Sequence, residues 1–236
     1  MLEAIENRIS RRTFDKLSFS KEEINQINSY IETLNKESSL TMEFLEDGSE
    51  AFSSFKKSYG LFNNVKSLIL MKGDIKDKNL KEKIGYYGEE LVLHLTNLNI
   101  GTCWVGGTFD KNKLKIENTE ELICVIVIGK VKAETIKEKM IRKAMSNKRK
   151  SIKERLISDT ETIPKWVTEG LKAVTLAPSA RNSQKVMFEY KNSIVFAKVP
   201  NDYEFDLVDL GIAKKHFELV ANGKFEFGNN KQFILN

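Results

Sequence analysis

The sequence predicts a fold that contains both amphipathic helices and β-strands. Apolar residues recur at helical spacing over residues 20–35 and 80–99. Short runs rich in β-branched residues occupy 67–71 and 122–131, and the pair of runs over 186–199 is typical of a hairpin. The chain has 236 residues, a length that corresponds to one or two domains.

Each element has a local signal for its limits. The first helix begins at the capping-box pattern of Ser20 and Glu23, and the second stops before Gly101. The run over 122–131 is closed by Gly129 and is apolar enough to be buried on both faces of a sheet. The three helical stripes, the last near the C-terminus, are Ile24, Ile27, Ile31 and Leu34; Ile84, Tyr87, Leu91, Leu95 and Leu98; and Leu210, Ala213, Phe217 and Val220.

The composition is that of an ordinary globular protein. Hydrophobic residues make up 41% and charged residues 30%, which excludes a disordered, collagen-like or disulfide-rich chain. No stretch reaches the roughly 18 apolar residues of a membrane helix, and the N-terminus does not resemble a secretory signal, so we expect a cytoplasmic protein. The net charge of +5 favours solubility and an anionic ligand. The densest basic run, 137–155, is interrupted by acidic residues and lacks aromatic ones, so we expect a solvated face there rather than a nucleic-acid site.

Cysteine and histidine are too scarce for a zinc site, and their spacing matches no metal-ligand motif. Cys124 lies inside an apolar run and is expected to be a small buried hydrophobic residue. Neither Cys103 nor Cys124 has a histidine nearby in sequence. We expect His94 and His216, both within predicted helices, to be core or surface residues.

A basic motif occurs twice in the chain. Arg8-x-Ser10-x-Arg12 recurs as Arg149-x-Ser151-x-Lys153, 141 residues later. Each copy is followed by an amphipathic helix, then by strands, and then by a helix that begins near a glycine, Gly88 in one half and Gly211 in the other. The order predicts a fused, unequal duplication, with chance recurrence of a short basic motif as the alternative.

Arg8-Ile9-Ser10-Arg11-Arg12 is the first candidate binding segment. In an extended backbone, Arg8, Ser10 and Arg12 share one face, and two guanidinium groups with a hydroxyl form a phosphate receptor. A basic arm in solvent is the alternative.

Two further segments combine residue types that suit a flat heterocycle. Gly101-Thr102-Cys103-Trp104-Val105-Gly106-Gly107 places three glycines and a tryptophan in one predicted turn, where the backbone can approach a ligand; a helix end and a core tryptophan are the alternative. Ala177-Pro178-Ser179-Ala180-Arg181-Asn182-Ser183-Gln184 is a turn with amide and hydroxyl groups, suited to the edge of a heterocycle or to an ordinary Asx or Ser turn.

Together these three segments resemble the nitroreductase family of FMN-dependent oxidoreductases. They are similar to its R-x-S-x-R, G-T-C-W-x-G-G and P-S-x-x-N-x-Q elements. Lys148-Arg149-Lys150-Ser151 is similar to the family's basic segment after the central strand, and Ile126-Val127-Ile128-Gly129 to that strand itself. The resemblance extends over most of the chain, and the combination of motifs is more specific than any one of them.

The resemblance implies an α+β fold with a central mixed β-sheet wrapped by helices. In the family, two subunits form an intertwined dimer that holds FMN at its interface. Here residues 35–40 lack the proline and asparagine of the P-S-x-x-N element, and residues 222–228 keep little of G-T-C-W. Each half has kept what the other lost, so the resemblance implies a single-chain pseudo-dimer of two halves, 1–145 and 146–236, with one FMN site.

The resemblance also assigns residues to that site. Side chains of Arg8, Ser10, Arg12 and Arg149 would hold the phosphate and ribityl chain, and backbone amides over 105–107 would approach the N5 and O4 edge. Pro178, Ser179 and Asn182 would reach the ring from the second half. The full set of expected FMN-binding residues is Arg8, Ile9, Ser10, Arg12, Cys103, Trp104, Val105, Gly106, Gly107, Lys148, Arg149, Pro178, Ser179, Ala180, Asn182 and Gln184. No catalytic side chain and no metal are expected, because FMN carries the chemistry.

The implied reaction is a ping-pong hydride transfer from NADH or NADPH through FMN N5 to a nitroaromatic, a quinone or a similar electron-poor acceptor. The expected partner is therefore a small molecule, with no nucleic acid and no membrane, and the pseudo-dimer is monomeric with further association left open. Lys185 and Val186 stand where the family often has proline and tryptophan, so a flavin carrier or sensor without turnover is the alternative. Tyr59 and Gly60 lie near the flavin or form a simple turn.

Overall fold

The structure is a computed structural model that describes residues 2–53 and 62–236. Tyr59 and Gly60 lie outside the described residues. The chain forms two compact units: unit 1 consists of Met1–Glu6, Lys81–Glu90 and Met145–Asn236, and unit 2 consists of Asn7–Leu80 and Leu91–Ala144. Among the described helices, none is both long and apolar enough to cross a membrane.

Unit 2 is built on a four-stranded antiparallel sheet of order β1-β2-β4-β3. Its strands are β1 (Glu43–Leu45), β2 (Ser67–Asp74), β4 (Glu120–Lys130) and β3 (Ile100–Val105). β4 is buried from Leu122 to Ile128, because this apolar run lies in the middle of the sheet with both faces covered. The strands predicted over 67–71 and 122–131 are confirmed, and β2 continues three residues further than predicted.

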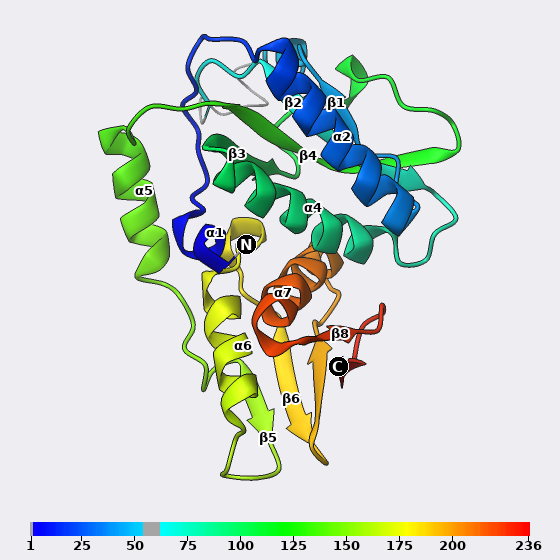
Figure 1. The fold of residues 1–236 in the computed structure, drawn as a ribbon, viewed down its shortest axis with the longest axis vertical. Helices are drawn as coiled ribbons and strands as arrows, with labels where there is room; N and C mark the ends of the chain where they lie inside the picture. Colours follow the sequence, from blue (N-terminus) through cyan, green and yellow to red (C-terminus); the bar gives the residue numbers. More distant parts are fainter. Residues whose placement is uncertain (1, 54–61) are drawn as a thin grey trace. The chain divides into compact units, whose positions relative to one another are not determined.

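Helix α2 (Lys21–Ser38) lies beside β1 (Figure 1). Its predicted capping box is confirmed: the Ser20 hydroxyl accepts from the Glu23 amide at 3.2 Å, and the Ser20 amide donates to the Glu23 carboxylate at 2.6 Å. The stripe buries Ile27, Ile31 and Leu34. The remaining elements of unit 2 are η1 (Ser49–Phe52), η2 (Lys111–Lys113), most of α5 (Ile136–Ser146) and the second half of α4 (Leu80–Asn97).

Unit 1 contains a five-stranded sheet of order β5-β6-β7-β9-β8. Its strands are β5 (Leu156–Ser158), β6 (Met187–Lys191), β7 (Ile194–Lys198), β9 (Lys231–Leu235) and β8 (Gly223–Phe225), and its helices include α1 (Leu2–Asn7), α6 (Lys165–Leu176) and α7 (Asp206–Ala221). β5 pairs in parallel with β6 and the other pairs are antiparallel, so this sheet is mixed. β6 and β7 form the predicted hairpin, with Phe188 opposite Ala197. Phe188 stacks on Phe217 of α7 in an aromatic core that also includes Phe225 and Phe233.

The two sheets share one topology. In the first, the order helix, strand, strand, helix, strand, strand runs α2-β1-β2-α4-β3-β4, and in the second it runs α6-β6-β7-α7-β8-β9. Both sheets place the fourth strand between the second and the third, and all of these pairs are antiparallel. Among the strands of the described residues, β5 alone has no counterpart in this order. The short β8 occupies the position of β3, which carries the Gly101–Gly107 sequence in the other sheet.

The first half of α4 crosses α7 at two glycines. A Cβ on Gly85 would lie 2.0 Å from the carbonyl oxygen of Val208, and a Cβ on Gly211 would lie 2.0 Å from that of Glu82. Val208 lies three residues before Gly211, and Glu82 lies three residues before Gly85. The two contacts are therefore equivalent, as they would be for two helices related by a two-fold axis. Glycine is required at both positions, because any side chain would overlap the facing backbone.

Polar pairs beyond the glycines repeat this reciprocity. Lys215 Nζ lies 2.6 Å from Glu90 Oε2, and His216 Nε2 lies 2.9 Å from Glu89 Oε1. Lys215 lies four residues after Gly211, and its partner Glu90 lies five residues after Gly85. For His216 and Glu89 these two spacings are exchanged, so the second pair mirrors the first. His216 is fully buried, and its Nδ1 lies 3.1 Å from the carbonyl oxygen of Ala173. Nδ1 donates to that carbonyl, because a carbonyl oxygen can only accept.

Candidate functional site

The basic segment 8–12 is extended and lies against β3 in unit 2. Ser10 forms a parallel bridge with Thr102, and the Arg11 amide donates to the Thr102 carbonyl at 2.8 Å. Because side chains alternate along an extended chain, Arg11 points away from its neighbours and donates to Glu138.

The thiol of Cys103 lies beside the other polar side chains of this segment. The charges of Arg12 and Arg8 and a hydrogen bond with Ser10 act to lower its pKa, but burial has the larger effect and raises the pKa of Cys103. The thiol therefore stays protonated. The Arg12 guanidinium is half-buried and makes one hydrogen bond, to the Ser10 carbonyl at 3.3 Å, and it forms no ion pair with a described carboxylate.

Glu138 fixes the backbone of the basic segment. One carboxylate oxygen accepts from the amides of Arg12 at 2.8 Å and Thr13 at 3.1 Å and from Arg11 Nε at 3.3 Å. The other accepts from the Thr135 amide at 2.9 Å and hydroxyl at 3.0 Å. Burial alone would raise the pKa of Glu138, but the hydrogen bonds from Arg12, Thr135 and Thr13 outweigh it and lower the pKa to about 2. Glu138 therefore stays ionised and anchors the start of α5 to this segment.

Most of the segment over 101–107 is a strand, so the prediction of a single turn is wrong. β3 pairs with β4 from Ile100 to Val105, and the bend begins only at Gly106. The hydrogen bonds and burial of this central pairing outweigh the glycine content. A Cβ on Gly101 would lie 2.2 Å from Val131 Cγ1, so that glycine serves packing, whereas one on Gly107 would meet no atom within 4 Å. Backbone at the end of β3 is therefore open to close approach.

In unit 1 the loop over 177–184 follows α6 and is conformationally strained. Arg181, Asn182 and Gln184 have φ of 53°, 55° and 51°, in the left-handed region that costs a residue other than glycine about 1 kcal/mol or more. Tertiary contacts must hold such a loop, and the Asp209 carboxylate of α7 supplies one. It accepts from the Ala180 amide at 2.9 and 3.1 Å.

Asp209 is buried beneath the loop. Burial raises the pKa of Asp209 to about 7. The hydrogen bond from the Ala180 amide acts to lower this pKa, and the charge of the nearby Asp206 acts to raise it. Ser183 adds a weaker hydrogen bond at 3.4 Å. The loop is thus attached to a carboxyl group that changes its protonation near neutral pH.

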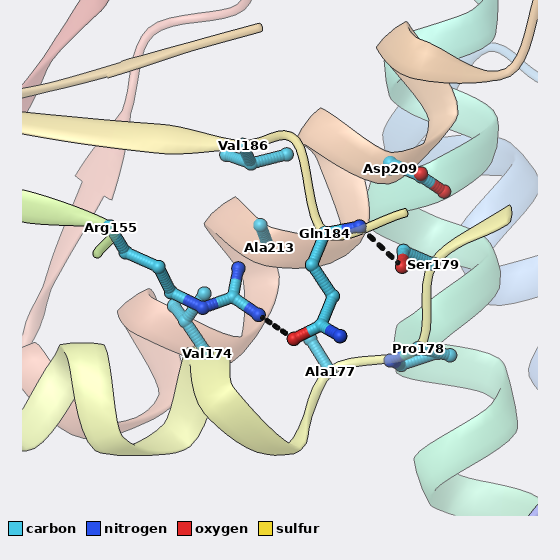
Figure 2. A pocket seen from close by; sticks show the side chains of 9 residues that line it. All are labelled: Arg155, Val174, Ala177, Pro178, Ser179, Gln184, Val186, Asp209 and Ala213. Carbon is cyan, nitrogen blue, oxygen red and sulfur yellow. Dashed lines mark hydrogen bonds between the residues drawn. The ribbon is translucent and has the colours of Figure 1, made fainter. Parts of the chain in front are cut away.

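Gln184 connects the loop to Arg155 (Figure 2) and to the basic segment 148–150. Its Oε1 accepts from Arg155 Nη2 at 2.5 Å and from the Lys150 amide at 2.9 Å, and its Nε2 donates to the Lys148 carbonyl at 2.9 Å. Only 4% of Gln184 is exposed. Its side chain is therefore occupied in holding Lys148, Arg149 and Lys150 in place.

The second copy of the basic motif has a different conformation from the first. Ser151 is not paired with a strand of the described residues. Its amide and hydroxyl each donate to the Glu154 carboxylate at 2.8 Å, in a turn. Lys148 and Arg149, just before this turn, are exposed. Most side chains from 137 to 155 are exposed, as expected for a solvated face, and Glu138 and Arg155 are the buried exceptions.

The predicted site residues fall into two sets, each assembled within one unit. The set of unit 2 is Arg8, Ile9, Ser10, Arg12, Cys103, Trp104, Val105, Gly106 and Gly107. The set of unit 1 is Lys148, Arg149, Pro178, Ser179, Ala180, Asn182 and Gln184. In unit 1, Asn182 Nδ2 donates to the Met145 carbonyl at 3.3 Å, so the loop also contacts the end of α5.

A model of a protein family described as "Putative TM nitroreductase" matches residues 1–221. The chain belongs to this nitroreductase family. The crystal structure of a "putative nitroreductase" from Thermotoga maritima MSB8 has the same fold, with a TM-score of 0.65 and 24% identity over 98% of this chain and 90% of that one. The predicted family and the α+β fold class are thereby confirmed.

Other nitroreductase structures are more distant. An "FMN-dependent Nitroreductase" from Clostridium difficile R20291 is 17% identical with a TM-score of 0.48, and covers 57% of this chain and 90% of that one. A "Nitroreductase with Bound FMN" from Bacteroides fragilis NCTC 9343 is 15% identical with a TM-score of 0.42, and covers 57% and 93%. Their TM-scores, both under 0.5, show only a limited similarity to the fold of this nitroreductase-family chain. No curated protein matches it.

Three residues of the nitroreductase-family chain that support the candidate site had not been predicted: Glu138, Asp209 and Arg155. Only Glu138 has a local signal, because Thr135 and Glu138 form a capping-box pattern at the start of α5. Asp209 and Arg155 lie far in sequence from the groups they contact, so no local pattern marks them.

The cysteines and histidines have structural roles. Cys124 is buried in β4 as predicted, and His94 stacks on Tyr30 with ring centroids 3.7 Å apart. The described residues contain no group of three or more histidine, cysteine or acidic side chains placed to bind a metal ion.

Lys185 and Val186 are part of the scaffold of unit 1. Lys185 pairs with Asp206 at 3.3 Å and with Asp202, and Val186 is buried in the aromatic core. Local packing therefore accounts for both residues, and nothing about them favours a binding protein over an enzyme.

Proposed function

We propose that this chain is an FMN-dependent oxidoreductase that uses NADH or NADPH to reduce a nitroaromatic, a quinone or a similar electron-poor acceptor. Membership of the nitroreductase family supports the reaction type. The observation that carries the assignment is the extended segment 8–12, which presents Arg8, Ser10 and Arg12 on one side while Arg11 anchors its other side to Glu138.

The donor set of unit 2 fits a phosphate ester. Two guanidinium groups and a hydroxyl are the donors that bind phosphate in proteins, and the Arg12 guanidinium forms no ion pair among the described residues. Glu138 neutralises Arg11 rather than Arg12, so the local charge on the phosphate side stays positive. The open backbone after β3 would in turn supply amide donors to the ring edge.

Bound FMN would supply the redox chemistry, taking a hydride from the reduced nicotinamide and passing two electrons to the acceptor. The residues of this chain bind and orient. Glu138 holds the backbone at Arg12, Asp209 holds the loop at Ala180, and Gln184 holds the basic segment 148–150. A protonated, buried Cys103 offers no competing nucleophile.

We further propose that both residue sets serve one FMN, in a chain that arose by fusion of two halves, 1–145 and 146–236. The shared sheet order and the reciprocal contacts at Gly85 and Gly211 support an internal two-fold relation. The loss of the G-T-C-W sequence at the short β8 supports a single site rather than two.

The visible spectrum of the purified protein with a flavin count tests this proposal. We expect a yellow protein with one FMN per chain, and anaerobic addition of NADH or NADPH should bleach the flavin within seconds. Failure to take up added FMN would refute the proposal, and two FMN per chain would refute the single site. Retention of colour with both nucleotides would support a flavin carrier or sensor instead.

Variants separate the two residue sets. Arg12→Ala in unit 2 and Asn182→Ala in unit 1 should each weaken FMN retention at least about tenfold, the effect of losing one charge-assisted or buried hydrogen bond. Arg142→Ala is the matched control, because Arg142 is an exposed arginine whose partner is Glu134 on the same segment. An effect of only one of the two variants would show that the sets do not share a cofactor.

A further inference from the structure

Arg155 is a buried cation of unit 1 to which neither the sequence nor the proposed reaction assigns a role. It precedes β5, and its backbone is fixed on both sides: its amide donates to the Ile152 carbonyl at 3.0 Å, and its carbonyl accepts from the Phe188 amide at 2.7 Å. Only 3% of the residue is exposed. The side chain is therefore almost completely buried.

The hydrogen bonds of the Arg155 guanidinium are incomplete. Nη2 donates to Gln184 Oε1, but buried Nε has no acceptor, and no carboxylate of the described residues forms an ion pair with Arg155. The neighbouring Glu154 carboxylate is exposed and bonded to Ser151 instead. Burial lowers the pKa of Arg155; the charge of Glu154 acts to raise the pKa, and the charge of Arg149 acts to lower it. A buried guanidinium with an unsatisfied donor and no ion-paired carboxylate favours binding of a compensating anion.

A small, partly open cavity adjoins this guanidinium (Figure 2). Its walls are Val174, Ala177, Pro178, Ser179, Gln184, Val186, Asp209 and Ala213, together with Arg155 itself. Oε1 of Gln184 already accepts two hydrogen bonds, and the Asp209 carboxylate is directed to the Ala180 amide. The remaining walls are mostly apolar, and the Ser179 hydroxyl accepts from the Gln184 amide at 3.0 Å, so none of them accepts from Arg155 Nε.

We propose that this cavity binds a small, singly charged anion of the halide type against the Arg155 guanidinium. One unpaired cation calls for one negative charge. The accessible space has the size of one small ion or water molecule, which favours an inorganic ion over an organic ligand. Apolar walls favour an anion that loses its hydration easily, such as chloride or bromide, over sulfate. The ion would complete the contacts of Arg155 and, through Gln184, stabilise the basic segment 148–150.

Chloride binding to the full-length protein tests the proposal without reference to flavin. In chloride-35 NMR, the wild type should broaden the chloride line, and added bromide should reverse the broadening. Thermal unfolding at constant ionic strength should give a Tm that rises with chloride and saturates, by roughly a few degrees, when sodium chloride replaces sodium gluconate. Bromide should act like chloride, and sulfate should not compete.

Variants locate the ion. Arg155→Gln should abolish both effects, and Ala177→Val, which narrows the cavity but keeps the guanidinium, should weaken them at least tenfold. Arg12→Gln and Arg142→Gln should retain them, which separates this site from the proposed phosphate site and from a surface arginine. Equal Tm values in chloride and gluconate for the wild type would overturn the proposal, as would chloride effects that persist in Ala177→Val and Arg155→Gln.

Discussion

Glu138→Gln tests whether one buried carboxylate determines the geometry of the basic segment. The glutamine oxygen can still accept from the Arg12 and Thr13 amides, but its NH₂ group then faces the Thr135 amide and the charge opposite Arg11 is lost. A carboxyl whose pKa falls from its ordinary 4.5 to about 2 contributes about 3 kcal/mol to stability when ionised. We therefore expect the variant to be about 3 kcal/mol less stable at pH 7.

Urea unfolding followed by circular dichroism from pH 7 to pH 3 measures this contribution. Because the folded pKa is lowered, the stabilisation is complete above the unfolded value of 4.5 and is lost as the pH falls towards 2. The difference between wild type and variant should therefore shrink as the pH falls. Glu134→Gln is the control, because Glu134 pairs with the exposed Arg142 and should cost at most about 1 kcal/mol. A difference below about 1 kcal/mol for Glu138→Gln at pH 7, or one that is independent of pH, would refute the reasoning.

Two further variants test the crossing of α4 with α7 and the support of the strained loop. Gly211→Ala places a methyl group 2.0 Å from the Glu82 carbonyl oxygen and should lower stability by about 2 kcal/mol or more, whereas Gly107→Ala, which meets no atom within 4 Å, should leave Tm nearly unchanged. Equal Tm values for the two would contradict the close approach. Asp209 has a folded pKa of about 7 against an unfolded 3.8, so the wild type should lose up to about 4 kcal/mol as the pH rises from 4 to 7. Asp209→Asn, which keeps an acceptor for the Ala180 amide, should remove that loss, and parallel pH profiles of the two proteins would contradict the buried carboxyl.

Local patterns in the sequence predicted the regular elements well. The capping box at Ser20, the stripe that ends at Leu34 and the apolar run of β4 each act within one element, so their spacing is readable from the chain. Local patterns gave the wrong prediction for the Gly101–Gly107 segment. Its glycine content predicts a turn, but pairing of β3 with the buried β4 makes most of it a strand. Pairing energy depends on a partner 20 or more residues away, which a local pattern does not contain.

The sequence by itself determined the family, the α+β fold class and the motifs that the two residue sets carry. Tertiary structure alone decided what holds those motifs in place. Glu138, Asp209 and Gln184 act on backbone groups up to 126 residues away. Their effect comes from burial, which strengthens each hydrogen bond and shifts each pKa, and burial is a property of the assembled fold rather than of any segment.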